Sequence, residues 1–166
     1  MQNVILVDTF DLAIGTMEKM EAHQKGVLHR AFSVFVFNTQ GEMLLQQRAQ
    51  EKYHSAGLWT NTCCSHPQPG EEIVYAAQKR LTEEMGFSCE LYVKDKFIYK
   101  VELENNLIEH ELDYILTGTF SGNIFPDTTE VQDFKWISVE QVKKEIENKP
   151  ELFTFWFKEI LKNFRF

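Results

Sequence analysis

The sequence has few cysteines, no long apolar run and no excess of positive charge. Its three cysteines, Cys63, Cys64 and Cys89, are odd in number and two are adjacent. This pattern excludes a disulfide framework and favours a reducing compartment. No segment approaches the roughly 20 apolar residues that span a bilayer, and the first residues lack the basic and apolar parts of a signal peptide. We therefore expect a cytoplasmic protein without a membrane partner.

Negative charge is in excess, because 25 Asp and Glu residues outnumber 17 Lys and Arg residues and give a formal net charge of −8. This balance argues against a nucleic-acid partner that binds through a basic surface. An anionic small-molecule substrate would require a local group of positive side chains that reverses the overall charge.

The 166 residues contain no fixed-period repeat, no low-complexity tract and no linker rich in Gly, Ser or Pro. Apolar content of 43% is enough for a sizeable core. Residues 1–166 are therefore predicted to form a single domain.

Apolar patterning predicts strands that alternate with helices. Apolar runs rich in β-branched and aromatic residues indicate strands at 4–7, 28–37, 43–47, 96–102, 108–120 and 134–137. Turn residues at 38–41 and 105–106 predict two hairpins. Helical spacing and capping signals indicate helices at 71–84, 138–150 and 152–161. This order predicts an α/β or α+β fold, with a mixed sheet sandwiched between helices.

Histidines and paired carboxylates indicate a metal site. Glu109 and Glu111 lie two positions apart in a predicted strand, so both side chains point to the same face. Two carboxylates at that separation repel unless a cation lies between them. Histidine and carboxylate ligands together suit divalent ions such as Mn²⁺, Fe²⁺ or Zn²⁺, and the spaced histidines are His23, His29 and His66. Taken singly, each histidine has an ordinary core or surface position as its alternative.

Residues 65–86 partly resemble a Nudix box, a motif with a helix whose carboxylates hold Mg²⁺ against a diphosphate. The ending Glu-Glu-x-Gly matches the motif, whereas Ser65 stands at its opening glycine and Lys79-Arg80 at its Arg-Glu pair. An arginine in place of the metal-binding carboxylate disfavours diphosphate hydrolysis, yet Arg80 can bind a diphosphate. The alternative for this segment is an ordinary amphipathic helix with a charged outer face.

Six short segments follow one another in the order and spacing of one known family. The strongest is 57–67, Gly-Leu-Trp-Thr-Asn-Thr-Cys-Cys-Ser-His-Pro. The supporting segments are 18–23, 28–33, 47–49, 109–111 and 153–156. Together they resemble the type I isopentenyl-diphosphate isomerases, non-hydrolytic members of the Nudix superfamily. The resemblance implies a Nudix-type fold and isomerisation of isopentenyl diphosphate to dimethylallyl diphosphate through a carbocation, in isoprenoid biosynthesis.

The resemblance also implies two ion sites. The implied protein ligands of one Mn²⁺ or Zn²⁺ ion are His23, His29, His66, Glu109 and Glu111. Glu84 is the implied carboxylate for a second ion, Mg²⁺, that also contacts the diphosphate.

Further roles follow from the same resemblance. Cys64 and Glu111 resemble the two residues that add and remove protons, and the order in which they act is left open. Tyr99 resembles the partner that orients Glu111, and a turn near Asn105 places it opposite or diagonal to that residue. Trp156 resembles the aromatic side chain that faces the reacting carbons. The implied diphosphate-binding residues are Lys19, Arg48, Lys52, Ser65 and Arg80.

Two other functions compete with the isomerase. One is a Nudix pyrophosphatase acting on a nucleoside diphosphate derivative, which the Lys79-Arg80 pair disfavours. The other is a non-catalytic Nudix module that binds a ligand and regulates a partner, for which an acid–base pair has no evident use. For the isomerase we expect isopentenyl diphosphate as the small-molecule substrate and a monomer or weak homodimer.

Overall fold

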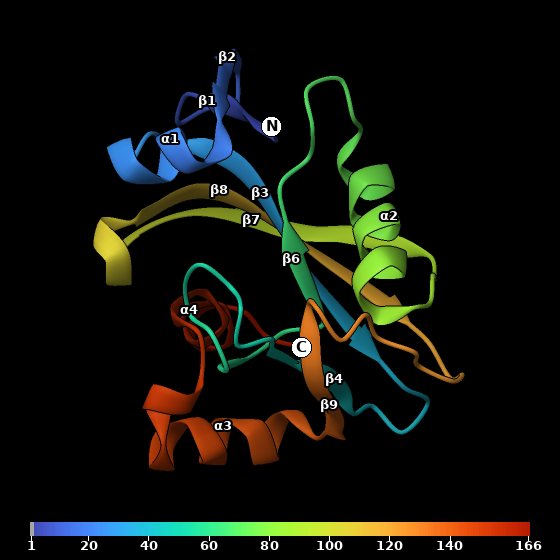
Figure 1. Cartoon of the computed structure of the whole chain (residues 1–166). Helices are drawn as coiled ribbons and strands as arrows, with labels where there is room; N and C mark the ends of the chain where they lie inside the picture. Colours follow the sequence, from blue (N-terminus) through green and yellow to red (C-terminus); the bar gives the residue numbers. More distant parts are fainter. Residues whose placement is uncertain (1) are drawn as a thin grey trace.

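The computed structural model describes residues 2–166, and the strands of this part of the chain belong to one nine-stranded mixed sheet (Figure 1). The strands are β1 (Asn3–Val7), β2 (Ala13–Glu18), β3 (His29–Phe37), β4 (Met43–Arg48), β5 (Trp59–Thr60), β6 (Cys63–Ser65), β7 (Leu91–Glu102), β8 (Ile108–Thr119) and β9 (Val131–Ile137). The α-helices are α1 (Lys19–Lys25), α2 (Ile73–Met85), α3 (Val139–Asn148) and α4 (Phe155–Asn163).

Strand β3 is central to the sheet. It pairs in parallel with β8 along its whole length and antiparallel with β6, and it also pairs antiparallel with β1 at its first residue and with β4 at its last. Its side chains are buried on both faces, because Phe32, Val34 and Val36 pack with α2 whereas Phe35 packs with α4. A strand covered on both faces reads as a continuous apolar run, which is the pattern of residues 28–37. The predicted mixed sheet between helices is therefore confirmed.

Helix α2 covers one face of the sheet. Its apolar side is buried at Ala77, Leu81 and Met85. The helix ends at Gly86, which has a φ of 72° and lies so close to the backbone oxygen of Phe125 that a Cβ would clash there. Helices α3 and α4 cover the opposite face (Figure 1). No helix between residues 2 and 166 combines the length and the apolar character needed to cross a membrane.

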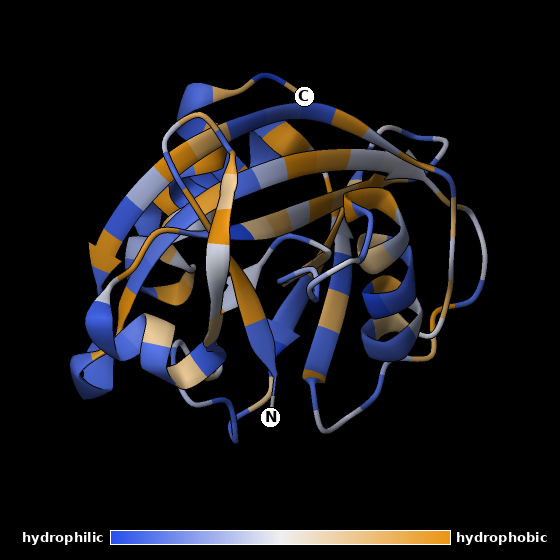
Figure 2. Cartoon of the chain, turned by 90° about the horizontal axis from the view of Figure 1, so that it is seen from above, coloured by the Kyte–Doolittle hydropathy of each residue, from blue (hydrophilic) through white to orange (hydrophobic). Residues whose placement is uncertain are grey.

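Strands β7 and β8 form a long antiparallel hairpin, and hydrophobic and hydrophilic residues alternate along the long strands of the sheet (Figure 2). Tyr99 lies directly opposite Glu111 in this ladder, so the predicted register is confirmed. The predicted strand at 96–102 starts too late, because β7 begins at Leu91. The missed part contains a register shift between Val93 and Asp95, which interrupts the alternation.

The first predicted hairpin is only partly right. The turn at 38–41 forms, but β3 and β4 pair at Phe37 and Met43 and then separate. Beyond that point β4 pairs with β5 and β9. The sequence patterns also missed β2, β5, β6 and α1, which are short or exposed, and the helix expected from residue 71 begins at Ile73.

Candidate active site

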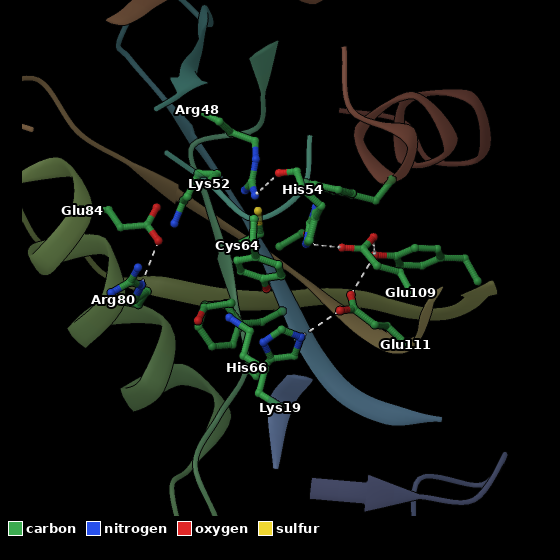
Figure 3. Close-up of a pocket in the computed structure, with 16 residues that line it drawn as sticks. Lys19, Arg48, Lys52, His54, Cys64, His66, Arg80, Glu84, Glu109 and Glu111 are labelled. Carbon is green, nitrogen blue, oxygen red and sulfur yellow. Dashed lines mark hydrogen bonds and ion pairs between the residues drawn. The ribbon is translucent and has the colours of Figure 1, made fainter. Parts of the chain in front are cut away.

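A polar pocket brings together side chains from both ends of the chain (Figure 3). Cys64 lies between two groups in this view, with Arg80 and Glu84 on one side and Glu109 and Glu111 on the other. The pocket is lined by each of the residues for which a catalytic or substrate-binding role was predicted: Lys19, Arg48, Lys52, Cys64, Ser65, Arg80, Tyr99, Glu111 and Trp156.

Three histidines and a carboxylate converge beside the pocket, and His66 and Glu111 are the members of this group that line it. The ring nitrogen Nε2 of His66 lies 2.8 Å from Oε1 of Glu111. The Nε2 atoms of His29 and His23 lie 3.5 Å and 4.0 Å from the same oxygen. One ligand atom from each of these four residues lies within 4.8 Å of the others. The chain therefore gathers four of the five predicted ligands of the Mn²⁺ or Zn²⁺ site.

The orientation of two of these rings fits a metal ion. His23 and His29 each place Nδ1 at hydrogen-bond distance from a backbone carbonyl, 2.7 Å and 2.8 Å away. These contacts hold the hydrogen on Nδ1 and leave the lone pair of Nε2 free. Both Nε2 atoms are buried and have no hydrogen-bond partner among residues 2–166. Buried nitrogen acceptors that converge on a carboxylate suit a divalent cation, because the cation would satisfy all of them.

The fifth predicted ligand, Glu109, belongs to an adjoining group. Its Oε1 lies 3.3 Å from Nε2 of His54, and a second potential ligand set comprises His23, His54 and Glu109. Its Oε2 lies 2.9 Å from the hydroxyl of Tyr99. Glu109 therefore sits beside the four-residue group, with both oxygens in contact with other side chains.

The two buried glutamates have opposite electrostatic environments. Burial, and then the negative charge of Glu111, raise the pKa of Glu109 well above its usual value. Burial also opposes ionisation of Glu111, but contacts with His29 and His66 outweigh it and hold the pKa of Glu111 well below its usual value. Burial also lowers the pKa of His66 to about 3, so its ring is neutral. Glu111 is therefore the ionised member of the pair.

Strand β6 separates the adjacent cysteines, because successive side chains point to opposite faces. Cys63 is fully buried in the core beneath α2, whereas Cys64 lines the pocket. Burial raises the pKa of the Cys64 thiol to about 12, so the thiol keeps its proton at neutral pH. Of the two thiols, the one that reaches the pocket is Cys64.

Positive side chains also line the pocket. Burial, followed by the charges of Lys52 and Arg80, lowers the pKa of Lys19 to about 8. Lys52 pairs with Glu130, and the Nη2 atom of Arg80 lies 2.9 Å from the same carboxylate. Cations close enough to lower the pKa of Lys19 form a site for an anion with several charges.

Arg48 and Trp156, two of the predicted site residues, form hydrogen bonds with other segments of the pocket wall. Arg48 donates hydrogen bonds to the carbonyl oxygens of His54 and Ser55, at 3.0 Å and 3.1 Å. Its guanidinium also lies 5.5 Å from the ring centre of Trp156. Trp156 donates a hydrogen bond of 3.2 Å to Asn61. The indole is therefore fixed at the pocket wall.

The carboxylate predicted for Mg²⁺, Glu84, is buried and held from two directions. It accepts hydrogen bonds of 2.7 Å from Arg80 and 2.9 Å from Gln46. The sequence patterns missed Gln46, His54 and Glu130. Gln46 and Glu130 contact residues that are 38 and 78 positions away in the chain. His54 lies in the irregular segment between β4 and β5. No local sequence pattern indicates any of the three.

The chain is similar to known proteins over most of its length. The NUDIX domain profile matches residues 27–157. A Burkholderia multivorans protein named isopentenyl-diphosphate Delta-isomerase is 52% identical over 94% of this chain and 89% of its own length. Proteins of the same name from Serratia proteamaculans and Photobacterium profundum are 51% and 48% identical, each over 96% of this chain and over 89% and 92% of their own lengths.

Solved structures agree on the fold. A Deinococcus radiodurans protein superposes with a TM-score of 0.80 at 14% identity and covers 97% of this chain and 98% of its own. The MutT protein of Methanosarcina mazei superposes with a TM-score of 0.68 at 15% identity and covers 81% of this chain and 91% of its own. At these identities the likeness concerns the fold alone.

Proposed function

Because the chain belongs to the isopentenyl-diphosphate Delta-isomerases, a family with a NUDIX domain, we propose that it converts isopentenyl diphosphate to dimethylallyl diphosphate by adding one proton and removing another. The terminal alkene carbon gains a C–H bond and the carbon nearer the diphosphate loses one, so the double bond moves by one position. The observation that carries this proposal is that Cys64 and Glu111 line one pocket together with a group of cations.

The diphosphate is assigned to the basic side chains that line the pocket. Lys19, Lys52 and Arg80 supply positive charge there, and the bidentate guanidinium of Arg80 suits phosphate oxygens. Mg²⁺ at Glu84 would neutralise part of the diphosphate charge. The diphosphate would compete with Glu130 for Lys52 and Arg80. This arrangement explains how a chain of net charge −8 binds an anion.

A divalent ion, Mn²⁺ or Zn²⁺, is assigned to His23, His29, His66, Glu109 and Glu111. When bound, it would supply positive charge beside Glu111 and tune the proton affinity of that carboxylate. The backbone carbonyls that hold Nδ1 of His23 and His29 orient these rings for the ion.

Proton transfer is assigned to Cys64 and Glu111. The thiol carries a proton at neutral pH, whereas the carboxylate is ionised, so the pair contains one donor and one acceptor. Tyr99 contacts Glu111 at 2.7 Å and orients its carboxylate.

The reaction passes through a tertiary carbocation, which needs stabilisation without a nucleophile nearby. The π-face of Trp156 offers cation–π attraction of about 2 kcal/mol when water is excluded. Trp156 lines the pocket, and its hydrogen bond to Asn61 fixes the indole, which supports this role.

The test is an assay of isopentenyl diphosphate with Mg²⁺ in deuterated water. The proposal expects dimethylallyl diphosphate with deuterium in a newly formed methyl group. Release of phosphate or pyrophosphate without this product would instead favour a pyrophosphatase. Binding without any turnover would favour a regulatory module.

A further inference from the structure

His54 is a buried histidine without an assigned role. It lies between β4 and β5, and 4% of its surface is exposed. Its Nε2 lies 3.3 Å from Oε1 of Glu109, and a dashed line joins the two side chains in Figure 3. Its Nδ1 lies 3.3 Å from the hydroxyl oxygen of Ser55. Both ring nitrogens therefore have a polar neighbour inside the protein.

The two neighbours indicate which ring nitrogen carries the hydrogen. A neutral imidazole has one N–H donor and one acceptor. The Ser55 hydroxyl can donate to Nδ1, whereas the carboxylate of Glu109 can only accept when it is ionised to bind a metal. The consistent arrangement places the hydrogen on Nε2, where it faces Glu109.

The ring of His54 has little freedom to turn. It stacks on the ring of His23, with centroids 6.2 Å apart and an angle of 26°. It meets Trp156 edge-on, with centroids 6.0 Å apart and an angle of 89°. Arg48 holds its backbone through a hydrogen bond of 3.0 Å to the carbonyl oxygen. A ring that packs against two neighbouring rings and whose backbone is held can orient a neighbouring carboxylate.

Glu109 needs such a partner. Its side chain is buried, and Tyr99 contacts only Oε2. Without His54, Oε1 would lose its nearest nitrogen partner, and the carboxylate could rotate away from His23. Buried carboxylates are stabilised only when their oxygens are satisfied.

We propose that His54 is a positioning residue that holds Glu109 in place beside the histidine cluster for binding of the divalent ion. The inference rests on the proposed metal site, because it assigns the residue that orients one of the ligands. Groups that orient metal ligands typically contribute 10- to 100-fold to metal affinity. His54 is expected to contribute a factor in this range without binding the ion itself.

The experiment measures the affinity of the full-length, metal-stripped chain for Zn²⁺ alone, by competition with a chromophoric chelator. His54→Phe keeps a ring edge against Trp156 but removes the N–H group. His54→Gln restores an N–H donor of similar reach. The matched control is His110→Gln, since His110 lies in β8 outside the pocket and contacts the carbonyl oxygen of Gly26 at 3.0 Å.

His54→Phe is expected to weaken Zn²⁺ binding by about 10- to 100-fold, and His54→Gln is expected to recover most of this loss. The control should stay within about twofold of the unchanged chain. With Co²⁺ as the probe, the visible absorption of the Phe variant should change in shape, whereas the Gln variant should resemble the unchanged chain. Thermal unfolding of the metal-free variants checks that both remain folded.

Unchanged affinity in His54→Phe would overturn the role of His54 and leave the metal site standing. Equal, large losses in the Phe and Gln variants would identify His54 as a ligand and overturn the positioning role. Absence of tight Zn²⁺ binding by the unchanged chain would overturn the metal site and, with it, this inference.

Discussion

The hydroxyl of Tyr99 lies 2.7 Å from Oε2 of Glu111, and the two residues stand directly opposite each other in the β7–β8 ladder. The same hydroxyl lies 2.9 Å from Glu109. A phenol has one hydrogen to donate, so Tyr99 couples the orientation of the two carboxylates. This contact links the register of a hairpin to the geometry of the proposed acid–base residue.

Tyr99→Phe removes the hydroxyl and keeps the ring in the core. We expect kcat to fall by about 10- to 100-fold, because Glu111 loses the group that orients it, whereas KM should change little. The free energy of unfolding should fall by about 1–3 kcal/mol, since a buried acceptor loses a partner. Steady-state kinetics and denaturant unfolding measure both. Tyr92→Phe is the matched control, because Tyr92 lies in the same strand and is exposed, and it should leave kcat unchanged.

Cys64→Ala should reduce kcat by about 100-fold or more, because general acid–base catalysis contributes at least that factor. The fold should be retained, since the side chain lines a pocket. Cys63→Ala is the matched comparison: it removes a thiol from the packed core beneath α2. This second variant should lose stability and keep its activity. Full activity of Cys64→Ala would contradict the proposed role.

Metal removal should abolish turnover. Elemental analysis of the purified chain is expected to find about one tightly held Mn²⁺ or Zn²⁺ ion per chain. Dialysis against a strong chelator should remove both the ion and the activity, and adding back the ion together with Mg²⁺ should restore the activity. Undiminished turnover in a metal-free preparation would refute the metal role of the histidine cluster.

Substrate capture should weaken above about pH 8, where Lys19 loses its proton. The pH profile of kcat/KM reports groups of the free enzyme, and a neutral Lys19 no longer attracts the diphosphate. In Lys19→Arg the fall of kcat/KM at alkaline pH should disappear, because a guanidinium stays charged. Lys25→Arg, on the exposed side of α1, serves as the control and should leave the alkaline fall of kcat/KM unchanged.

Stability should respond to the same titration in the opposite direction. The pKa of Lys19 falls from 10.5 to about 8 in the folded chain, so between these values the unfolded chain binds more protons. The contribution of Lys19 to the free energy of unfolding therefore rises with pH over this window. Denaturant unfolding across pH 8 to 10.5 measures this rise in the free energy of unfolding. The rise should be present in the unchanged chain and absent in Lys19→Met.

Much of the fold follows from local patterns. The apolar run at 28–37 indicates a strand buried on both faces, and β3 has that position. The turn at 105–106 predicted Tyr99 opposite or diagonal to Glu111, and the ladder places the two residues directly opposite each other. In contrast, β2 has mostly exposed side chains and α1 spans only seven residues, so neither carries an apolar periodicity that a sequence pattern could reveal.

The sequence by itself determined the chemistry that the chain carries: histidines and carboxylates for a metal ion, a thiol two residues before His66, and basic residues scattered from Lys19 to Arg80. Only the tertiary structure decided how these groups meet. In the structure the side chain of Cys63 packs in the core, whereas that of Cys64 lines the pocket. His54 lies beside Glu109, 55 positions away, and Glu130 lies beside Lys52, 78 positions away. Local patterns do not encode such contacts, because they depend on how strands and loops distant in the chain pack together.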